Sequence, residues 1–223
     1  MKSSNISYKR NTFKTYYFEN EDTNNEYNFP TLDYVKPQKV QNILPFNIFK
    51  TNPDKNSWIH FFIDDYQFER VWQQPTQYLN LLKQADGVIT TDFSMYIDMP
   101  KALQIYNCYR NRALARYFQK EGINIIPAVG WSDKDSFSWC FDGIAYGSAV
   151  AISSNGCYSN PVAKTNFIEG FYKMLEIINP CQVVFVGKVP AELKDIYVIQ
   201  HFSSHGEIFN KRSKIWAEEE AVL

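Results

Sequence analysis

Six short apolar runs recur along this chain, and each is followed by a small cluster of polar or glycine residues. Such runs, separated by helical segments, are typical of βα units, in which parallel strands alternate with helices. The carboxyl ends of parallel strands meet at one edge of a sheet, where α/β proteins place their ligands. The clusters therefore predict where a site lies. The runs are Trp58 to Ile63, Val88 to Thr91, Ile123 to Val129, Ser148 to Ile152, Val183 to Val186 and Ile196 to Ile199.

The spacing of the runs narrows the fold class. At 223 residues, the chain fits one α/β domain more readily than two. Polar clusters after at least five runs favour an incomplete or distorted (β/α) barrel, because every strand end of a barrel can contribute to a site. The alternative is an open, mostly parallel sheet with helices on both faces. The last interval, Gly187 to Asp195, is too short for a usual parallel crossover, so we expect the final strand to be antiparallel or outside the sheet.

Three helices are expected between the runs. The first, residues 67–85, is interrupted by Pro75, which predicts a kink or two shorter helices. The second covers residues 101–120, between a proline before its first turn and a glycine after its last. The third covers residues 162–178, and residues 135–141 form at most a short helix.

The first 57 residues show neither a helical stripe nor strand-like alternation. This predicts an irregular polar N-terminal arm, residues 1–57, before a single α/β domain of residues 58–223. The later part of the arm, Val40 to Phe49, is apolar enough to dock on the main body or to add an edge strand. Its first half is expected to be partly mobile, or to become ordered on a partner.

Charge and cysteine content exclude several classes of protein. A formal net charge of −1 argues against a chain whose main task is coating nucleic acid or an anionic membrane. The four cysteines lie far apart and form no Cys-x-x-Cys pair, so neither a zinc ribbon nor a disulfide framework is indicated. No stretch offers the ~20 apolar residues of a membrane span, nor the apolar core of a signal peptide. We therefore expect a cytoplasmic protein without a membrane partner.

The acids that follow the first two runs are the strongest candidates for chemistry. Asp64 and Asp65 come directly after the first run, and Asp92 comes after the second. Neighbouring side chains at a strand end diverge, so only one of the first two should face the mouth of the sheet. Asp64 and Asp92 would supply paired carboxylates for acid–base chemistry, or two ligands for Mg²⁺. The structural alternative is that Asp64 or Asp65 caps the helix that follows.

Arg110 is the basic residue that best fits such a site. It lies within the apolar stripe of the helix at residues 101–120, where a guanidinium needs a carboxylate or a phosphate. Pairing with Asp64 or Asp92 would orient that acid, and binding a substrate phosphate is the functional alternative. Arg112 and Arg116 lie one turn apart on another face.

These two arginines, Arg112 and Arg116, are expected to be solvated charges. With Lys120, they would otherwise form a basic face for DNA.

Two later clusters are candidate substrate-binding elements. Trp131 could stack on a base or a sugar, or simply cover the mouth, while Ser132 with Asp135 resembles a capping box. The turn from Ser153 to Cys157 could cradle an anion with its backbone N–H groups. Cys157 as a nucleophile would need a nearby histidine, and no family spacing provides one. The expected catalytic residues are Asp64, Asp92 and Arg110, and the expected substrate-binding residues are Asp65, Ser94, Asn107, Trp131, Ser132, Asp133, Ser153, Asn155 and Cys157.

Several of these motifs occur together in one known family. They are Phe62-Ile63-Asp64-Asp65-Tyr66-Gln67-Phe68-Glu69-Arg70-Val71-Trp72, Asp92-Phe93-Ser94-Met95-Tyr96, Asp98-Met99-Pro100, Tyr109-Arg110-Asn111-Arg112 and Val129-Gly130-Trp131-Ser132-Asp133. In this the chain resembles a family of uncharacterised proteins from phages, plasmids and conjugative elements of Gram-positive bacteria, classed as a domain of unknown function (4417). The resemblance covers about residues 58–186 and leaves the arm outside. It implies a mobile-element accessory protein in the cytoplasm of a bacterial host, and it transfers no activity.

Two hypotheses for function follow. The first is a carboxylate-centred hydrolase or transferase that acts on a nucleotide or nucleic acid at a glycosidic or phosphoester bond. The second is a non-catalytic binder, such as an inhibitor of a host defence protein or a sponge for a nucleotide signal.

Overall fold

The computed structural model describes residues 14–18, 23, 25–158, 160–196 and 198–204. All strand pairs in its two sheets are parallel, and the strands follow one another in chain order. This confirms the α/β class. The first sheet holds β1 (Ile43–Pro45), β2 (Trp58–His60), β3 (Gly87–Ile89) and β4 (Ile125–Ile126), and the second holds β5 (Val150–Ser153), β6 (Val183–Val186) and β7 (Ile199–Phe202).

A single parallel bridge between Ala128 and Ala151 connects the two sheets just beyond β4. Alternate residues of β5 and β6, such as Ala151 and Val184, pack into the same core cluster as β2, β3 and β4. The opposite faces of β5 and β6 pack in a second cluster with α6 (Pro161–Ile178). Within the described residues no ladder joins β7 to β1, so a closed barrel is not confirmed.

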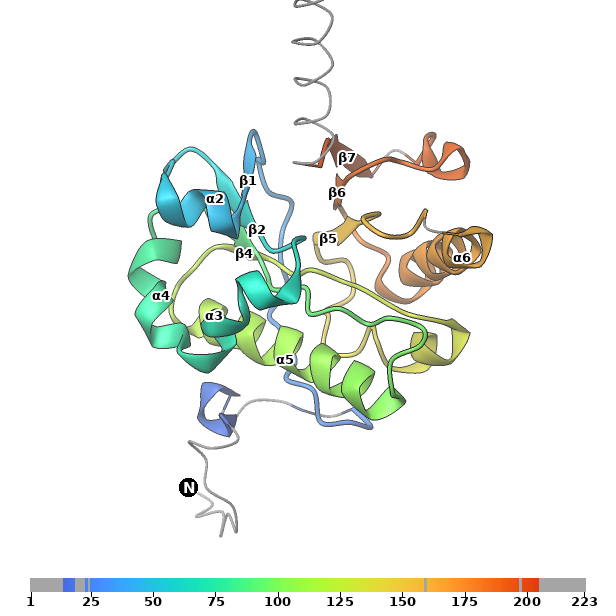
Figure 1. Cartoon of the computed structure of the whole chain (residues 1–223), viewed down its shortest axis with the longest axis horizontal. Helices are drawn as coiled ribbons and strands as arrows, with labels where there is room; N and C mark the ends of the chain where they lie inside the picture. Colours follow the sequence, from blue (N-terminus) through green and yellow to red (C-terminus); the bar gives the residue numbers. More distant parts are fainter. Residues whose placement is uncertain (1–13, 19–22, 24, 159, 197, 205–223) are drawn as a thin grey trace, which may run out of the picture.

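The helices follow the proline signals of the sequence. The first expected helix is split at Pro75 into two, and the second has the expected bounds. Figure 1 shows α5 lying along the β1–β4 half of the molecule and α6 beside β5–β7. No helix within the described ranges is both long and apolar enough to cross a membrane. The remaining helices are α2 (Phe46–Thr51), α3 (Glu69–Gln73), α4 (Pro75–Leu82), α5 (Lys101–Lys120) and the 3₁₀ helices η1 (Thr15–Phe18), η2 (Asp65–Gln67), η3 (Lys134–Ser138) and η4 (Ala191–Leu193).

The later part of the arm is built into the fold. Residues of β1 pair with β2 as the edge strand that the apolar segment 40–49 predicted. Upstream of β1, the arm crosses the amino-terminal ends of the second sheet. The Ala149 N–H donates to Val35 O at 2.7 Å, and the Gln200 side chain donates to Val40 O at 2.6 Å. The predicted mobility of the first half falls largely on residues 1–13 and 19–22, which lie outside the described residues.

The expectation for the final strand was wrong. β7 runs parallel to β6, with Val183 opposite Ile199. The strand begins at Ile199 rather than Ile196, so the connection from Gly187 is longer than the sequence suggested, and it contains η4. That added length is enough for a parallel crossover without a full α-helix.

Candidate functional site

Asp65, not Asp64, is the acid of the first cluster that turns toward the second. Its carboxylate accepts a hydrogen bond from the Ser94 hydroxyl at 2.9 Å and from the Ser94 backbone N–H at 3.1 and 3.2 Å. Asp64 is exposed, and its side chain makes no capping hydrogen bond at the start of η2. The capping role considered for this pair is therefore not observed. Burial raises the pKa of the Asp65 carboxyl, against the lowering effect of the Ser94 hydrogen bonds.

Asp92 lies beside this contact and is partly buried. Among the described residues its carboxyl group has no hydrogen-bond partner, and burial followed by the nearby charge of Asp65 raises its pKa to about 7. A Cβ atom added at Gly130 would lie 3.3 Å from Asp92 Oδ1, so the carboxyl group sits against the chain just after β4. The carboxyl ends of β2, β3 and β4 thus converge on these two acids.

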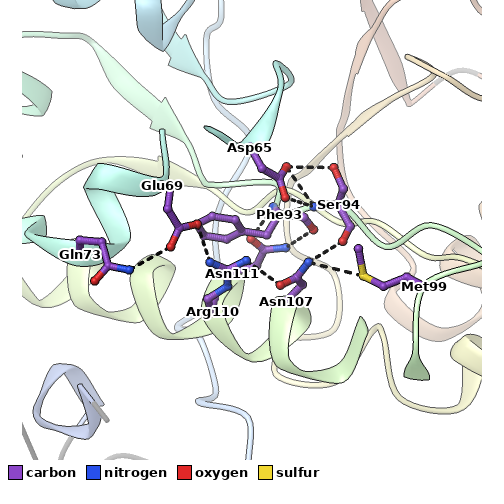
Figure 2. A network of polar contacts seen from close by, with 9 residues as sticks. All are labelled: Asp65, Glu69, Gln73, Phe93, Ser94, Met99, Asn107, Arg110 and Asn111. Atoms are coloured by element: carbon purple, nitrogen blue, oxygen red, sulfur yellow. Dashed lines mark hydrogen bonds and ion pairs between the residues drawn. The ribbon is translucent and has the colours of Figure 1, made fainter. Parts of the chain in front are cut away.

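A chain of polar side chains connects Asp65 to α5 and α3 (Figure 2). The Asn107 amide donates to Ser94 O at 2.6 Å, and Arg110 donates to Asn107 Oδ1 at 2.6 Å. Arg110 also forms an ion pair with Glu69 at 2.7 Å. The pairing of Arg110 with Asp64 or Asp92 that the sequence suggested is therefore replaced by Glu69. Arg110 still acts on Asp65 over a longer distance, where its charge lowers the pKa of that acid.

The turn after β5 reaches the same place from the second sheet. The Asn155 amide donates to Phe62 O at 3.3 Å, just before the Asp64–Asp65 pair. The Asn155 N–H donates to the Ser153 hydroxyl, which shapes the turn. Burial and the charge of Asp92 raise the pKa of the Cys157 thiol to about 12, so this thiol is protonated at neutral pH. Cys157 borders the acids but is not poised as a nucleophile.

The residues of the cluster at Trp131 make packing and hydrogen-bond contacts within the protein. The Trp131 indole donates to Asn166 O at 3.2 Å and stacks on Phe167, so its ring packs against α6. The Ser132 hydroxyl donates to the Gln104 side chain at 2.6 Å. The cap of η3 is Asp133, whose carboxylate accepts from the Ser136 N–H, and not Ser132 as the capping-box pattern predicted.

Arg112 and Arg116, expected to be solvated charges or else part of a basic face for DNA, both have protein partners. Arg112 is only 2% exposed and donates to the backbone carbonyls of Asp142, Ala128 and Cys140. Arg116 forms an ion pair with Asp33 of the arm at 2.6 Å. The prediction that both are solvated charges was wrong for Arg112, because that side of α5 is covered by the chain after β4.

Sequence reasoning missed three side chains that hold the loop after β3. Asn111 bonds Phe93 in both directions, with the Phe93 N–H donating to Asn111 Oδ1 at 2.9 Å. The Gln104 amide donates to Tyr96 O and Met99 O. Glu69 completes the set as the partner of Arg110. A signal was available, since Gln104, Asn107 and Asn111 recur at three- and four-residue steps on one face of α5.

The donor set for a metal ion is limited. Within the described part of the chain, no group of three or more His, Cys, Asp or Glu side chains gathers in a metal-binding arrangement. Asp65 and Asp92 would be the protein ligands of the Mg²⁺ that the sequence suggested, with the remaining positions filled by water or substrate oxygens. His60, which the strand pattern placed in the sheet, is buried and stacks on Phe62.

Comparison with known proteins identifies the family of this chain. A family model described as "Domain of unknown function (DUF4417)" matches residues 21–203. The chain belongs to this family. The match confirms the resemblance seen in the motifs, and it extends that resemblance from residue 58 back into the arm.

Two relatives of this DUF4417 protein come from phages. The chain is 42% identical to the Gene 1 protein of Mycobacterium phage L5 over 131 residues, which cover 59% of this chain and 57% of the relative. It is 35% identical to the Gene 1 protein of Mycobacterium phage D29 over 164 residues, which cover 73% of this chain and 61% of the relative. The chain thus spans about three fifths of the length of these curated relatives. No solved structure matches it.

Proposed function

We propose that this protein is a phage accessory enzyme, a carboxylate-centred hydrolase or transferase that acts on a nucleotide or nucleic acid. The observation that carries the proposal is the partly buried carboxyl group of Asp92, without a hydrogen-bond partner among the described residues, next to the hydrogen-bonded carboxylate of Asp65. Two carboxyl groups in different environments have different pKa values, so one can act as the general acid and the other as the general base. In this proposal Asp65 takes the place that the sequence gave to Asp64.

The two acids have different tasks. Because the pKa of Asp92 is about 7, a large fraction of it is protonated at neutral pH and can donate that proton to a leaving group. Asp65 accepts hydrogen bonds from Ser94 through both oxygens, which favours its ionised form. Ionised Asp65 takes a proton from an attacking water or hydroxyl group. Asn107 and Arg110 are positioning residues, because they act on Asp65 through Ser94.

The strand arrangement supports this location. Sequential parallel strands and a core shared by both sheets fit the incomplete barrel expected from the sequence. In such a fold the ends of β2, β3, β4 and β5 open at a common mouth. Asp65, Asp92, Gly130 and Asn155 come from those four ends.

Exposed aromatic side chains beside the acids support a substrate with planar bases. Tyr66 is 76% exposed and directly follows Asp65, while Tyr96 is 61% exposed and lies two residues after Ser94. Exposed tyrosine rings stack on bases of any sequence. The relatives from phages fit a substrate encountered during infection of a bacterium.

The test is turnover of a defined panel, namely ATP, AMP, NAD⁺, a cyclic dinucleotide and short single-stranded DNA and RNA, with products resolved by chromatography and mass spectrometry. Asp65→Asn and Asp92→Asn should each lower turnover at least 100-fold, the usual scale for losing a general acid or base. Asp64→Asn is the matched control, because it makes the same substitution at the residue before Asp65, whose side chain is exposed. Addition of EDTA tests the Mg²⁺ version of the proposal.

The second candidate function is a non-catalytic binder of a host protein. It is favoured by the exposed apolar and aromatic side chains of the loop after β3, where Tyr96 and Ile97 are 61% and 47% exposed. Absence of turnover on the whole panel would favour the binder. Full activity of Asp92→Asn on a substrate of the wild-type protein would contradict the catalytic proposal directly.

A further inference from the structure

A hollow whose lining includes neither Asp65 nor Asp92 lies against the first half of α5. Its volume is about 510 Å³, within the range of pockets that hold small molecules. Its walls come from three separate parts of the chain, namely the arm, the end of α3 and the first half of α5. Five aromatic rings line it: Tyr27, Phe29, Trp72, Tyr106 and Tyr109.

The rings are arranged to receive a flat molecule. Tyr106 and Tyr109 are nearly parallel, at 18°, and Trp72 stands almost perpendicular to both, at 87° and 78°. A planar ring placed here can meet one aromatic face and one aromatic edge at the same time. Tyr106 is 44% exposed, so the hollow is open to solvent on this side.

A cation stands at the rim of this hollow. Lys14 lines it and donates from Nζ to Gln73 O at 2.8 Å, which leaves two of its three N–H groups available. Lys14 also has a φ of 56°, a left-handed conformation that residues other than glycine rarely adopt. Such conformations persist where surrounding structure imposes them, and they concentrate at ligand clamps.

We infer that this hollow, which we call the aromatic pocket, binds a planar aromatic anion, with its ring packed against Trp72 and Tyr106 and its negative group at Lys14. The aromatic walls and the single cation at the rim match the two halves of such a ligand. The aromatic pocket is a different place from the Asp65–Asp92 site. Its occupancy does not depend on whether that site is catalytic.

The experiment titrates the full chain with 8-anilinonaphthalene-1-sulfonate, a planar aromatic anion whose fluorescence rises in apolar surroundings. Ala102→Trp fills the aromatic pocket from an exposed helix position and should weaken binding at least tenfold. Leu103→Trp is the matched control, because Leu103 is the next residue, is also exposed and does not line the pocket. Lys14→Gln should weaken binding several-fold and remove most of its dependence on salt.

Competition with AMP shows whether the natural ligand is a nucleotide or another aromatic anion. Displacement of the dye by AMP, but not by ribose 5-phosphate, assigns the aromatic pocket to nucleotides. Dye binding that is sensitive to Ala102→Trp but unaffected by AMP assigns it to other aromatic anions. Equal dye binding by Ala102→Trp and Leu103→Trp, in proteins with unchanged circular dichroism, would overturn the inference. Asp92→Asn should bind the dye normally, so failure of the proposed catalysis is distinguishable from failure here.

Discussion

The guanidinium of Arg110 stacks on the ring of Phe93, with its Cζ atom 3.6 Å from the ring centroid. This aromatic contact adds to the hydrogen bonds from Gln104, Asn107 and Asn111 by which α5 holds the loop after β3. Arg110 Nε is buried without a partner among the described residues, so NH1 and NH2 carry its polar contacts. Arg110 is thus held by the ion pair with Glu69 and by the stack on Phe93.

Replacement of Arg110 should destabilise the protein. In Arg110→Met, the side chain of Asn107 and one oxygen of Glu69 lose their partner, and the stack on Phe93 is weakened. Because Glu69 is 39% exposed, we expect a loss of about 2 kcal/mol, below the usual cost of breaking a fully buried pair. Urea unfolding of both proteins measures this change in the free energy of unfolding. The control is Arg70→Met, which removes an exposed arginine of α3 and should change stability by less than about 0.5 kcal/mol.

Asp92 should make stability fall as pH rises toward neutrality. Its pKa is about 7 in the folded protein against 3.8 for the ordinary group, so the folded state holds the proton more tightly. The stabilisation is fully present below pH 3.8, and it is lost as the pH rises through about 7. We expect Asp92→Asn to raise the free energy of unfolding at pH 8 by about 2 kcal/mol, with partial exposure reducing the effect.

The measurement for Asp92 is thermal unfolding at pH 5 and pH 8. The gain from Asp92→Asn should be larger at pH 8 than at pH 5, and Asp64→Asn should show no such difference. An equal gain at both pH values would mean that Asp92 is not protonated near neutrality in the folded protein.

Gly170 should not tolerate a side chain. A Cβ atom there would lie 2.2 Å from Trp131 Nε1, closer than any real contact. Gly170→Ala must push the indole away from Asn166 O and Phe167, at a cost of about 1–3 kcal/mol. The double variant with Trp131→Leu should cost less than the sum of the two single changes, as denaturant unfolding of all three proteins will show. Additive effects would count against the contact.

The four cysteines should react with iodoacetamide in a defined order at pH 7.5. Cys181 is exposed and should react first. Cys157 should be slow, because burial and the charge of Asp92 raise the pKa of its thiol to about 12. Cys108 and Cys140 are buried and should stay unmodified. Peptide mass spectrometry identifies the sites. Faster labelling of Cys157 than of Cys181 would contradict this placement.

Local signals in the sequence were enough to predict α3, α4, α5 and α6, but not α2, which lies in the predicted arm. Pro75 divides α3 from α4, and Pro100 precedes α5, because proline fits the first turn of a helix and no later one. The expected bounds of α6 differ from the structure by one residue, at Pro161. These features depend on neighbours within a few residues, which the sequence displays directly.

The site depended on contacts that local patterns do not contain. Asp64 and Asp65 are equivalent in sequence, and the choice between them is made by Ser94, 29 residues away. Arg112 lies on a face of α5 that the sequence periodicity predicts to be exposed. In the structure, backbone carbonyl groups from residues 128–142 surround its guanidinium. Such partners come from distant parts of the chain. Local patterns therefore identified the three acids, but they paired Asp92 with Asp64 and not with Asp65.

The crossing of the arm over the second sheet has a consequence for how the chain is made. The Gln38 N–H donates to the Gln182 side chain, and Val40 O accepts from Gln200, so two residues upstream of β1 are anchored by residues more than a hundred positions later in the chain. On the ribosome, the segment at residues 38–40 cannot complete its docking until residues 182 and 200 have emerged. A truncated product that ends before residue 182 would lack both anchors and would leave this segment more open to proteases.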